Sequence, residues 1–463
     1  LPALCRGERI AAFCLTEPGA GGDAAAVRAR ARIASAPGQP VGYQLTGTKV
    51  WVSNGGIADV FVVFAQTQVE REGAPVDRIT AFLVERGSGL RTGAEEPKVG
   101  VRASSMAAVY LDDVSVGPEA VLGTVGGGFK VAMEALSLGR PALAASCVGA
   151  ARELFRLTLQ HATSRRQFGR LVSSFGMIKD KVAQMQTELY AAESLVYLTT
   201  GLRDRAPRGD HALEAACVKV FASEMLQRTV HESLALVAGA GFSRAFPHER
   251  YLRDARAPLL FLGTNEILRA YIALTGLAGP GEQLAKLADA IKYPLRGYGV
   301  VVDSLLDKVK FAATGGAALT RHHPRLKKEA VLIEDDVDGL AQAVERSLRK
   351  HGRQISEMQY VQRRLAETAV LIYAMVAVVS RASEALQRAT RHAGVTISAI
   401  LHSDEVDREV RLARAFCLRA HSQVRARLAQ MVDNDDELRK GLADSAYHGR
   451  FYPFDAVLGD RDD

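Results

Sequence analysis

The sequence is poor in cysteine and tryptophan, and its cysteines form no clusters. Five cysteines and one tryptophan occur in 463 residues. Without CxxC pairs or cysteine–histidine groups, the sequence argues against a disulfide framework and against a structural zinc site, and it indicates a reducing compartment. We therefore expect no metal site. The cysteines are Cys5, Cys14, Cys147, Cys217 and Cys417.

The sequence also lacks an obvious membrane span and a separate basic tract. The apolar run at 369–379 is too short to cross a bilayer as a helix. The formal net charge is +7 at pH 7, but basic clusters such as 321–323 have acidic neighbours at 334–336 and no interleaved aromatic residues. This pattern disfavours nucleic-acid binding and leaves an anionic ligand or peripheral attachment to a lipid surface as alternatives.

The first residue is not methionine, and no charged segment followed by an apolar core occurs near it. Any targeting peptide is therefore expected to lie outside this sequence, together with an upstream segment. A length of 463 residues allows two or three domains, and 48% hydrophobic with 24% charged residues is typical of folded globular proteins.

Short β-rich runs and long helical patterns divide the sequence into an α+β organisation. Turn residues separate the runs at 43–46, 49–53, 60–64, 80–84 and 108–111, which predicts an antiparallel sheet or small barrel within residues 1–120. Residues 121–277 are predicted to form a helical bundle, with loops at 205–209 and 239–248.

Ala278-Gly-Pro-Gly opens a predicted linker at 278–284, and a second helical domain is expected over 285–463. Its clearest helix carries an apolar stripe with helical spacing, which predicts a core or subunit-packing face. The stripe comprises Val361, Leu365, Ile372, Met375, Val379, Ala382 and Leu386.

Glycine-rich segments at 19–22 and 126–128 lack the strand and helix context of a dinucleotide fingerprint, so each alone indicates only a loop. The order of several strings is more specific, and it closely resembles the acyl-CoA dehydrogenase family, in its very-long-chain branch. The strings are FCLTEPGAGGD from Phe13, KVWVSNG from Lys49, KVGVRAS from Lys98, GGGFKVAM from Gly126, RRQFG from Arg165, GAGF from Gly239, RDAR from Arg253 and GTNEILR from Gly263.

The resemblance implies the fold of that family: a middle β domain, a four-helix bundle and an extra C-terminal helical domain, with the family's N-terminal helical domain missing from this chain. It implies FAD as cofactor and long- or very-long-chain acyl-CoA as substrate. Electron-transfer flavoprotein is the implied electron acceptor, a homodimer the implied assembly, and mitochondrial fatty-acid β-oxidation the implied setting. One member of the branch, which the string from Glu266 to Leu277 resembles, is also an assembly factor for respiratory complex I.

The same resemblance assigns cofactor and substrate positions. Trp51 would lie on the flavin ring face rather than in the sheet core, and Arg165 would reach the FAD of a neighbouring subunit rather than being a solvated helix-end arginine. Hydroxyls and backbone groups at the N1–C2 edge and N5 suit a reduced flavin. The implied cofactor positions are Phe13, Leu15, Thr16, Trp51, Ser53, Arg165, Gln167, Ala235, Gly239, Thr264 and Asn265, and the substrate positions are Gly22, Arg140 and Gly263.

The resemblance breaks at the catalytic base. The family reaction needs a carboxylate beside the substrate α-carbon, and the two positions where members carry it hold Leu262 and Gly139. Glu266 is disfavoured as a substitute because its family counterpart faces the cofactor region. Ala235, Ala238 and Gly22 also depart from the family residues. A working dehydrogenase, a non-catalytic scaffold for complex I assembly, and a variant of an active enzyme remain the alternatives.

Overall fold

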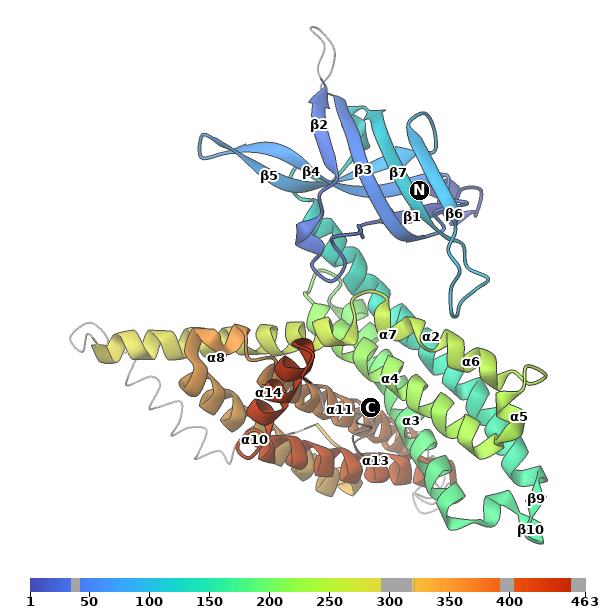
Figure 1. The fold of residues 1–463 in the computed structure, drawn as a ribbon. Coiled ribbons are helices and arrows are strands. Elements are labelled where there is room, and N and C mark those ends of the chain that lie inside the picture. Colours follow the sequence, from blue (N-terminus) through green and yellow to red (C-terminus); the bar gives the residue numbers. More distant parts are fainter. Residues whose placement is uncertain (35–41, 293–318, 320, 392–403, 451–463) are drawn as a thin grey trace, which may run out of the picture. The chain divides into compact units, whose positions relative to one another are not determined.

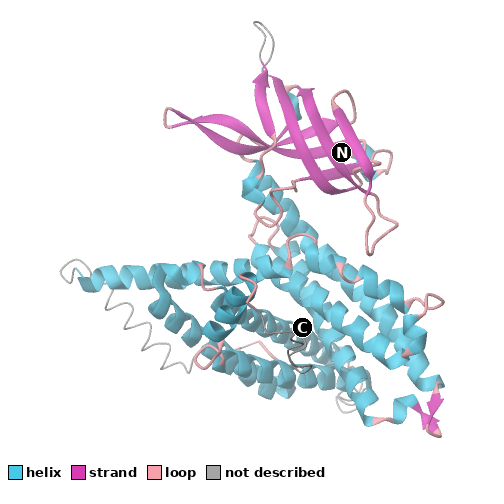
Figure 2. Cartoon of the chain, viewed as in Figure 1, coloured by secondary structure: helices cyan, strands magenta, loops and turns pink. Residues whose placement is uncertain are grey.

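The computed structural model describes residues 1–34, 42–292, 319, 321–391 and 404–450, which belong to two compact units, Leu1–Leu268 and Arg269–Asp463 (Figure 1). The first unit contains a sheet and a helical bundle, and the second is helical. Figure 2 distinguishes the strands of the sheet from the helices by colour.

The sheet of the first unit has the strand order β6-β7-β3-β2-β4-β5-β8, and β1 pairs with β4. The predicted antiparallel character is confirmed for most pairs, whereas β1 and β2 each run parallel to β4. Its core is formed by fully buried side chains such as Leu45, Phe61 and Phe82. The strands are β1 (Ala11–Cys14), β2 (Arg30–Ala34), β3 (Gly42–Ser53), β4 (Val60–Arg71), β5 (Ala74–Glu85), β6 (Leu90–Glu95), β7 (Met106–Val116) and β8 (Val121–Leu122).

One long strand, β3, replaces the two predicted runs at 43–46 and 49–53. The pairing of β3 with β7 shifts register between Leu45 and Gly47 and between Lys49 and Val52, so β3 remains one strand across Gly47. A Cβ on Gly47, which has φ 153°, would lie 2.6 Å from the Cβ of Ala29, so only glycine fits there.

The bundle of the first unit consists of α2 (Gly128–Ser164), α3 (Gly176–Arg205) and α4 (Ala212–Val237), with α8 (Asn265–Lys292) beginning at its end. Contacts with the sheet fix the start of α2: the Gly126 N–H donates to Thr80 Oγ1 over 2.8 Å, and a Cβ on Gly128 would lie 2.5 Å from the Thr80 carbonyl carbon. The remaining elements are α1 (Pro2–Cys5), α5 (Gly239–Phe242), α6 (His248–Asp254), α7 (Ala257–Leu260), β9 (Arg166–Gln167) and β10 (Arg170–Leu171).

The second unit contains the rest of α8 and α10 (Lys327–His351), α11 (Gln359–Arg391), α13 (Asp404–Ala429) and α14 (Asp436–Tyr447). The stripe on α11 is buried from Leu365 to Leu386, which confirms a core face. The predicted turn after Leu277 is wrong, because α8 continues through Pro280. An interior proline costs a helix about 3 kcal/mol, and the alanines and leucines on either side of Pro280 favour helix. The domain limits stay predictions.

Two described helices, α2 and α11, are long and apolar enough to cross a membrane by length and composition. Core helices of folded proteins pass the same test, and 61% of the α11 window is buried. In the second unit α11 packs against α10 and α13, so its apolar composition is explained by that core.

Candidate functional site

The two positions at which the resemblance predicts a glutamate are neighbours in the structure. Gly139 lies in α2 and Leu262 in the turn before α8, and a Cβ on Gly139 would lie 3.1 Å from Leu262 Cδ1. Arg140 joins them, since its buried side chain donates from Nε to the Leu262 carbonyl over 3.3 Å. The structure therefore brings Gly139, Arg140 and Leu262 into one site, where the two base positions offer an aliphatic side chain and a glycine.

The turn that holds Leu262 has an unusual backbone. Leu262 has φ 57° and Gly263 has φ 94°, so two successive residues occupy the left-handed region. Leucine is disfavoured there, and such conformations persist only where surrounding contacts impose them.

Lys219 of α4 supplies those contacts, and it was not among the predicted residues. Its fully buried Nζ donates to the carbonyls of Leu259 and Gly263 over 3.3 and 2.8 Å, and to Asn265 Oδ1 over 2.7 Å. Burial lowers the pKa of Lys219 to about 8. The available signal in the sequence is a lone lysine within the otherwise uncharged run Ala215–Ser223.

The start of α8 is tied to α4 through Asn265. The Asn265 amide is buried, accepts from Lys219, and donates from Nδ2 to Ser223 Oγ and Glu224 Oε1 over 3.1 and 3.0 Å. Thr264 Oγ1 accepts from the Ile267 N–H over 3.4 Å. These contacts give both residues a role in helix start, and their cofactor contacts stay predictions.

Gly22 lies beside α8, because a Cβ there would meet Ile267 Cγ1 at 3.3 Å. Glu266, the preceding residue of α8, is exposed. Gly22 therefore lies beside the first turn of α8, and its role as a substrate position stays a prediction.

The predicted flavin-side residues come together where β1 leads into a loop beside β3 (Figure 1). Buried Lys49 of β3 donates to the Leu15 carbonyl over 3.2 Å and to Glu17 Oε1 over 2.7 Å. The Val50 N–H donates to the Thr16 carbonyl over 3.0 Å. A buried ion pair and backbone bonds thus hold Phe13–Thr16 against the strand that carries Trp51 and Ser53.

Trp51 is 58% exposed, which contradicts the alternative that it is a sheet-core residue. Phe13 is 37% exposed and contacts Phe64 with ring centroids 5.0 Å apart. Ser53, two residues beyond Trp51 on β3, is also exposed. Two aromatic surfaces and nearby hydroxyls are therefore available to a planar heteroaromatic ligand.

A second group of predicted cofactor residues lies at the other end of the bundle. Ala162 of α2 packs with Leu236 and Val237 of α4, so the ends of these helices adjoin. Arg165 and Gln167, and likewise Ala235 and Gly239, are exposed there. Along α2, Arg165 lies about 37 Å from Arg140 at 1.5 Å per residue. Arg165 is therefore far from the Leu262 turn, which Arg140 contacts.

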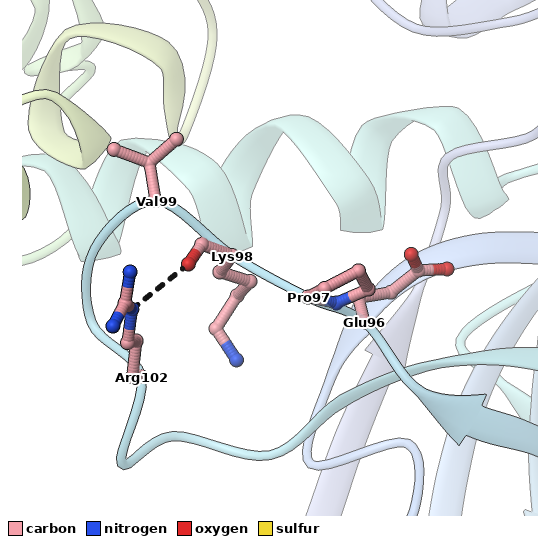
Figure 3. A pocket seen from close by; sticks show the side chains of 5 residues that line it. All are labelled: Glu96, Pro97, Lys98, Val99 and Arg102. Carbon is pink, nitrogen blue, oxygen red and sulfur yellow. Dashed lines mark hydrogen bonds between the residues drawn. The ribbon is translucent and has the colours of Figure 1, made fainter.

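A surface pocket lies on the loop after β6 (Figure 3). Its lining is Glu96, Pro97, Lys98, Val99 and Arg102, and none of these is a predicted site residue. Arg102 Nε donates to the Lys98 carbonyl over 3.1 Å. Among the residues that the structure describes, no three His, Cys, Asp or Glu side chains gather as metal ligands.

Known families match this chain in three parts. The profile "Acyl-CoA dehydrogenase, middle domain" matches residues 12–114, "Acyl-CoA dehydrogenase, C-terminal domain" matches residues 126–277, and "ACAD9/ACADV, C-terminal domain" matches residues 324–444. The first match covers the sheet, the second the bundle, and the third falls in the second unit.

Individual proteins agree with these matches. The very long-chain specific acyl-CoA dehydrogenase of human mitochondria is 41% identical over 394 residues, covering 83% of this chain and 59% of that protein. An acyl-CoA dehydrogenase of Bacillus subtilis is 34% identical over 282 residues, covering 60% of this chain and 71% of that protein. The structure of an acyl-CoA dehydrogenase from Bacillus anthracis, complexed with FAD, aligns with TM-score 0.74 and 28% identity over 99% of this chain and 75% of that one.

The chain spans 59% of the length of the human relative. Its likeness to the Bacillus subtilis protein nevertheless extends over most of that protein, and the sheet and bundle each match their own profile. The chain therefore belongs to the acyl-CoA dehydrogenase family.

Proposed function

We propose that this chain is part of an FAD-dependent flavoprotein of the very-long-chain acyl-CoA dehydrogenase type, acting in mitochondrial fatty-acid β-oxidation, with its proton-abstraction step impaired. Family membership and the mitochondrial human relative support the setting. When bound, FAD would accept the hydride that leaves the substrate β-carbon. Electron-transfer flavoprotein would then accept the electrons from the reduced flavin. Exposed Trp51 and Phe13, with the nearby Thr16 and Ser53 hydroxyls, fit an isoalloxazine ring.

The contact between Leu262 and Gly139 carries the proposed impairment. Removal of a proton from carbon needs an acceptor with a lone pair, and neither residue has one on its side chain. Loss of a general base costs a factor of about 10² to 10⁴ in rate. The Leu262 backbone N–H can still polarise a thioester carbonyl, because that interaction needs no side chain. We therefore expect the protein to bind acyl-CoA even though it dehydrogenates it slowly.

An anaerobic titration of the FAD-loaded protein with palmitoyl-CoA tests the proposal. Palmitoyl-CoA should perturb the flavin band, which reports binding, while bleaching should be at least about 100-fold slower than in a family member with a glutamate base. Rapid bleaching would contradict the impairment, and absence of any perturbation would contradict substrate binding.

A homodimer is part of the proposal, supported by the distance along α2 between Arg165 and the predicted substrate position Arg140. Arg165 and Gln167 lie exposed at the end of α2, about 37 Å from Arg140. A guanidinium on such a helix end is suited to fork onto pyrophosphate oxygens of a cofactor held mainly by a second copy.

A scaffold for complex I assembly is the second candidate. The lack of a carboxylate at Leu262 and Gly139 favours it, and the proposed binding surface is the second unit, which contains the match of residues 324–444. Affinity purification of the chain, intact and truncated after residue 292, measures recovery of complex I assembly proteins. Recovery only with the intact chain supports a scaffold that uses the second unit, and equal recovery from both excludes that surface.

A further inference from the structure

The buried lysine Lys219 of α4 hydrogen-bonds to the turn that holds Leu262. Lys219 is fully buried within α4, where an ammonium group is costly unless its hydrogen bonds are satisfied. It donates to oxygens of Leu259, Gly263 and Asn265, and all three belong to the segment that leads into α8.

These bonds bracket the strained part of the turn. The Leu259 carbonyl precedes Leu262, the Gly263 carbonyl follows it, and both accept from the same Nζ. Leu262 and Gly263 between them have φ values of 57° and 94°. Because a left-handed leucine relaxes unless its surroundings hold it, the lysine is placed to fix the direction of the Leu262 peptide.

We propose that Lys219 is the positioning residue of the acyl-CoA site, holding the Leu262–Gly263 turn in the conformation that presents the Leu262 backbone N–H to a thioester carbonyl. The inference rests on the proposed function for the identity of the ligand. Lys219 does not touch the ligand itself, and it acts through the turn that it holds at the Leu259 and Gly263 carbonyls.

The chemistry of the amine makes this role dependent on pH. A protonated lysine has three donors for its three oxygen partners, whereas a neutral amine has two. Burial is the main cause that lowers the pKa of Lys219 to about 8; Arg140 of α2 adds to it, while Cys147 of α2, Glu224 of α4 and Glu266 of α8 oppose it. One of the three hydrogen bonds from Lys219 is therefore lost as pH rises through about 8.

A chromophoric thioester, 4-dimethylaminocinnamoyl-CoA, reports the effect because its absorbance shifts to the red when the carbonyl is polarised. Bound to the FAD-loaded chain, it should show a red shift at pH 7 that decreases toward pH 9.5. Lys219→Met should remove most of the shift and its pH dependence, and Lys219→Arg should restore part of the shift without pH dependence. Lys181→Met, which removes an ion pair with Glu232 elsewhere in the bundle, is the control and should match wild type.

Retention of the full red shift in Lys219→Met, or a wild-type shift that is constant from pH 7 to 9.5, would overturn the inference. If Lys219→Met does not fold, the wild-type pH series decides alone. If wild type binds no thioester, the proposed function fails. Amide hydrogen exchange of residues 259–265 then decides the role of Lys219: after correction for intrinsic rates, it should accelerate at least about threefold between pH 7 and 9.5, and unchanged protection overturns the role.

Discussion

Ala238 occupies a backbone conformation suited to glycine, at φ 52° and ψ −130°. Ala238→Gly should stabilise the folded chain by about 1 kcal/mol, because strain of about 1–3 kcal/mol is relieved and only part is lost to the more flexible unfolded state. Denaturant unfolding measures the change. Ala240→Gly, inside α5 of the same loop, should instead destabilise by about 0.5–1 kcal/mol. A destabilising Ala238→Gly would show that the backbone there is not strained.

At the level of single residues, motif order predicted Leu262, Gly139 and Arg140, and the structure places them together. Lys219 was missed because hydrophobic periodicity identifies a helix face without identifying the oxygens that a buried lysine meets. Those oxygens belong to residues 40 or more positions later, and only the tertiary fold brings them near.

At the scale of elements, α2 packs closely against the turn before α8, where Leu262 lies against Gly139. Gly139→Ala should gain about 0.5–1 kcal/mol from helix propensity in a Leu262→Ala background. With Leu262 present that gain should be cancelled or reversed, since the added Cβ would lie 3.1 Å from Leu262 Cδ1. Denaturant unfolding of the double-mutant cycle should give a coupling of about 1 kcal/mol.

Gly149→Ala provides the matched control for this cycle. Gly149 also lies in α2, but a Cβ there would meet nothing within 4 Å. Its substitution should stabilise equally in both backgrounds. Equal effects of Gly139→Ala in both backgrounds would disprove the packing of Leu262 on α2.

In the second unit, α14 is held to α11 by a bidentate pair between buried Arg364 and partly buried Asp436, at 2.6 Å for both bonds. Arg364→Met should cost about 3 kcal/mol at pH 7. The guanidinium holds the pKa of Asp436 below its ordinary value, so the carboxylate stabilises at neutral pH and loses this contribution as pH falls below about 4.

Hydrogen exchange across α14 checks this prediction. The difference between wild type and Arg364→Met should be full at pH 7 and shrink in acid. Arg439→Met, which breaks an exposed pair within α14, should change exchange little. A difference that persists undiminished at pH 3 would contradict the role of the Asp436 carboxylate.

The sequence predicted which segments are strands and helices better than where they begin and end. The two predicted runs at 43–46 and 49–53 form one strand, β3, because both pair with β7 across a register shift at Gly47. That pairing is a tertiary contact, which the local pattern of residues does not contain. The predicted turn at Pro280 became helix although proline and glycine disfavour helix, and the strong helix formers on either side favour it.

For the whole molecule, a shared cofactor site can be tested by mixing damaged chains. Trp51→Ala and Arg165→Met should each weaken FAD binding about 10-fold in homodimers. In a heterodimer of the two variants, one site combines an intact Trp51 with the partner's intact arginine, so flavin absorbance should show half the sites restored. No restoration in purified heterodimers would place both residues at sites within one chain.

The absence of a base at Leu262 is the central claim, and restoring the base tests it most directly. The measurement is the anaerobic rate of flavin bleaching by palmitoyl-CoA in wild type, Leu262→Glu and Leu262→Gln, all loaded with FAD. Leu262→Glu should bleach at least about 100-fold faster than wild type, while Leu262→Gln, of similar size but without a basic carboxylate, should not. Wild-type bleaching as fast as that of Leu262→Glu would contradict the account.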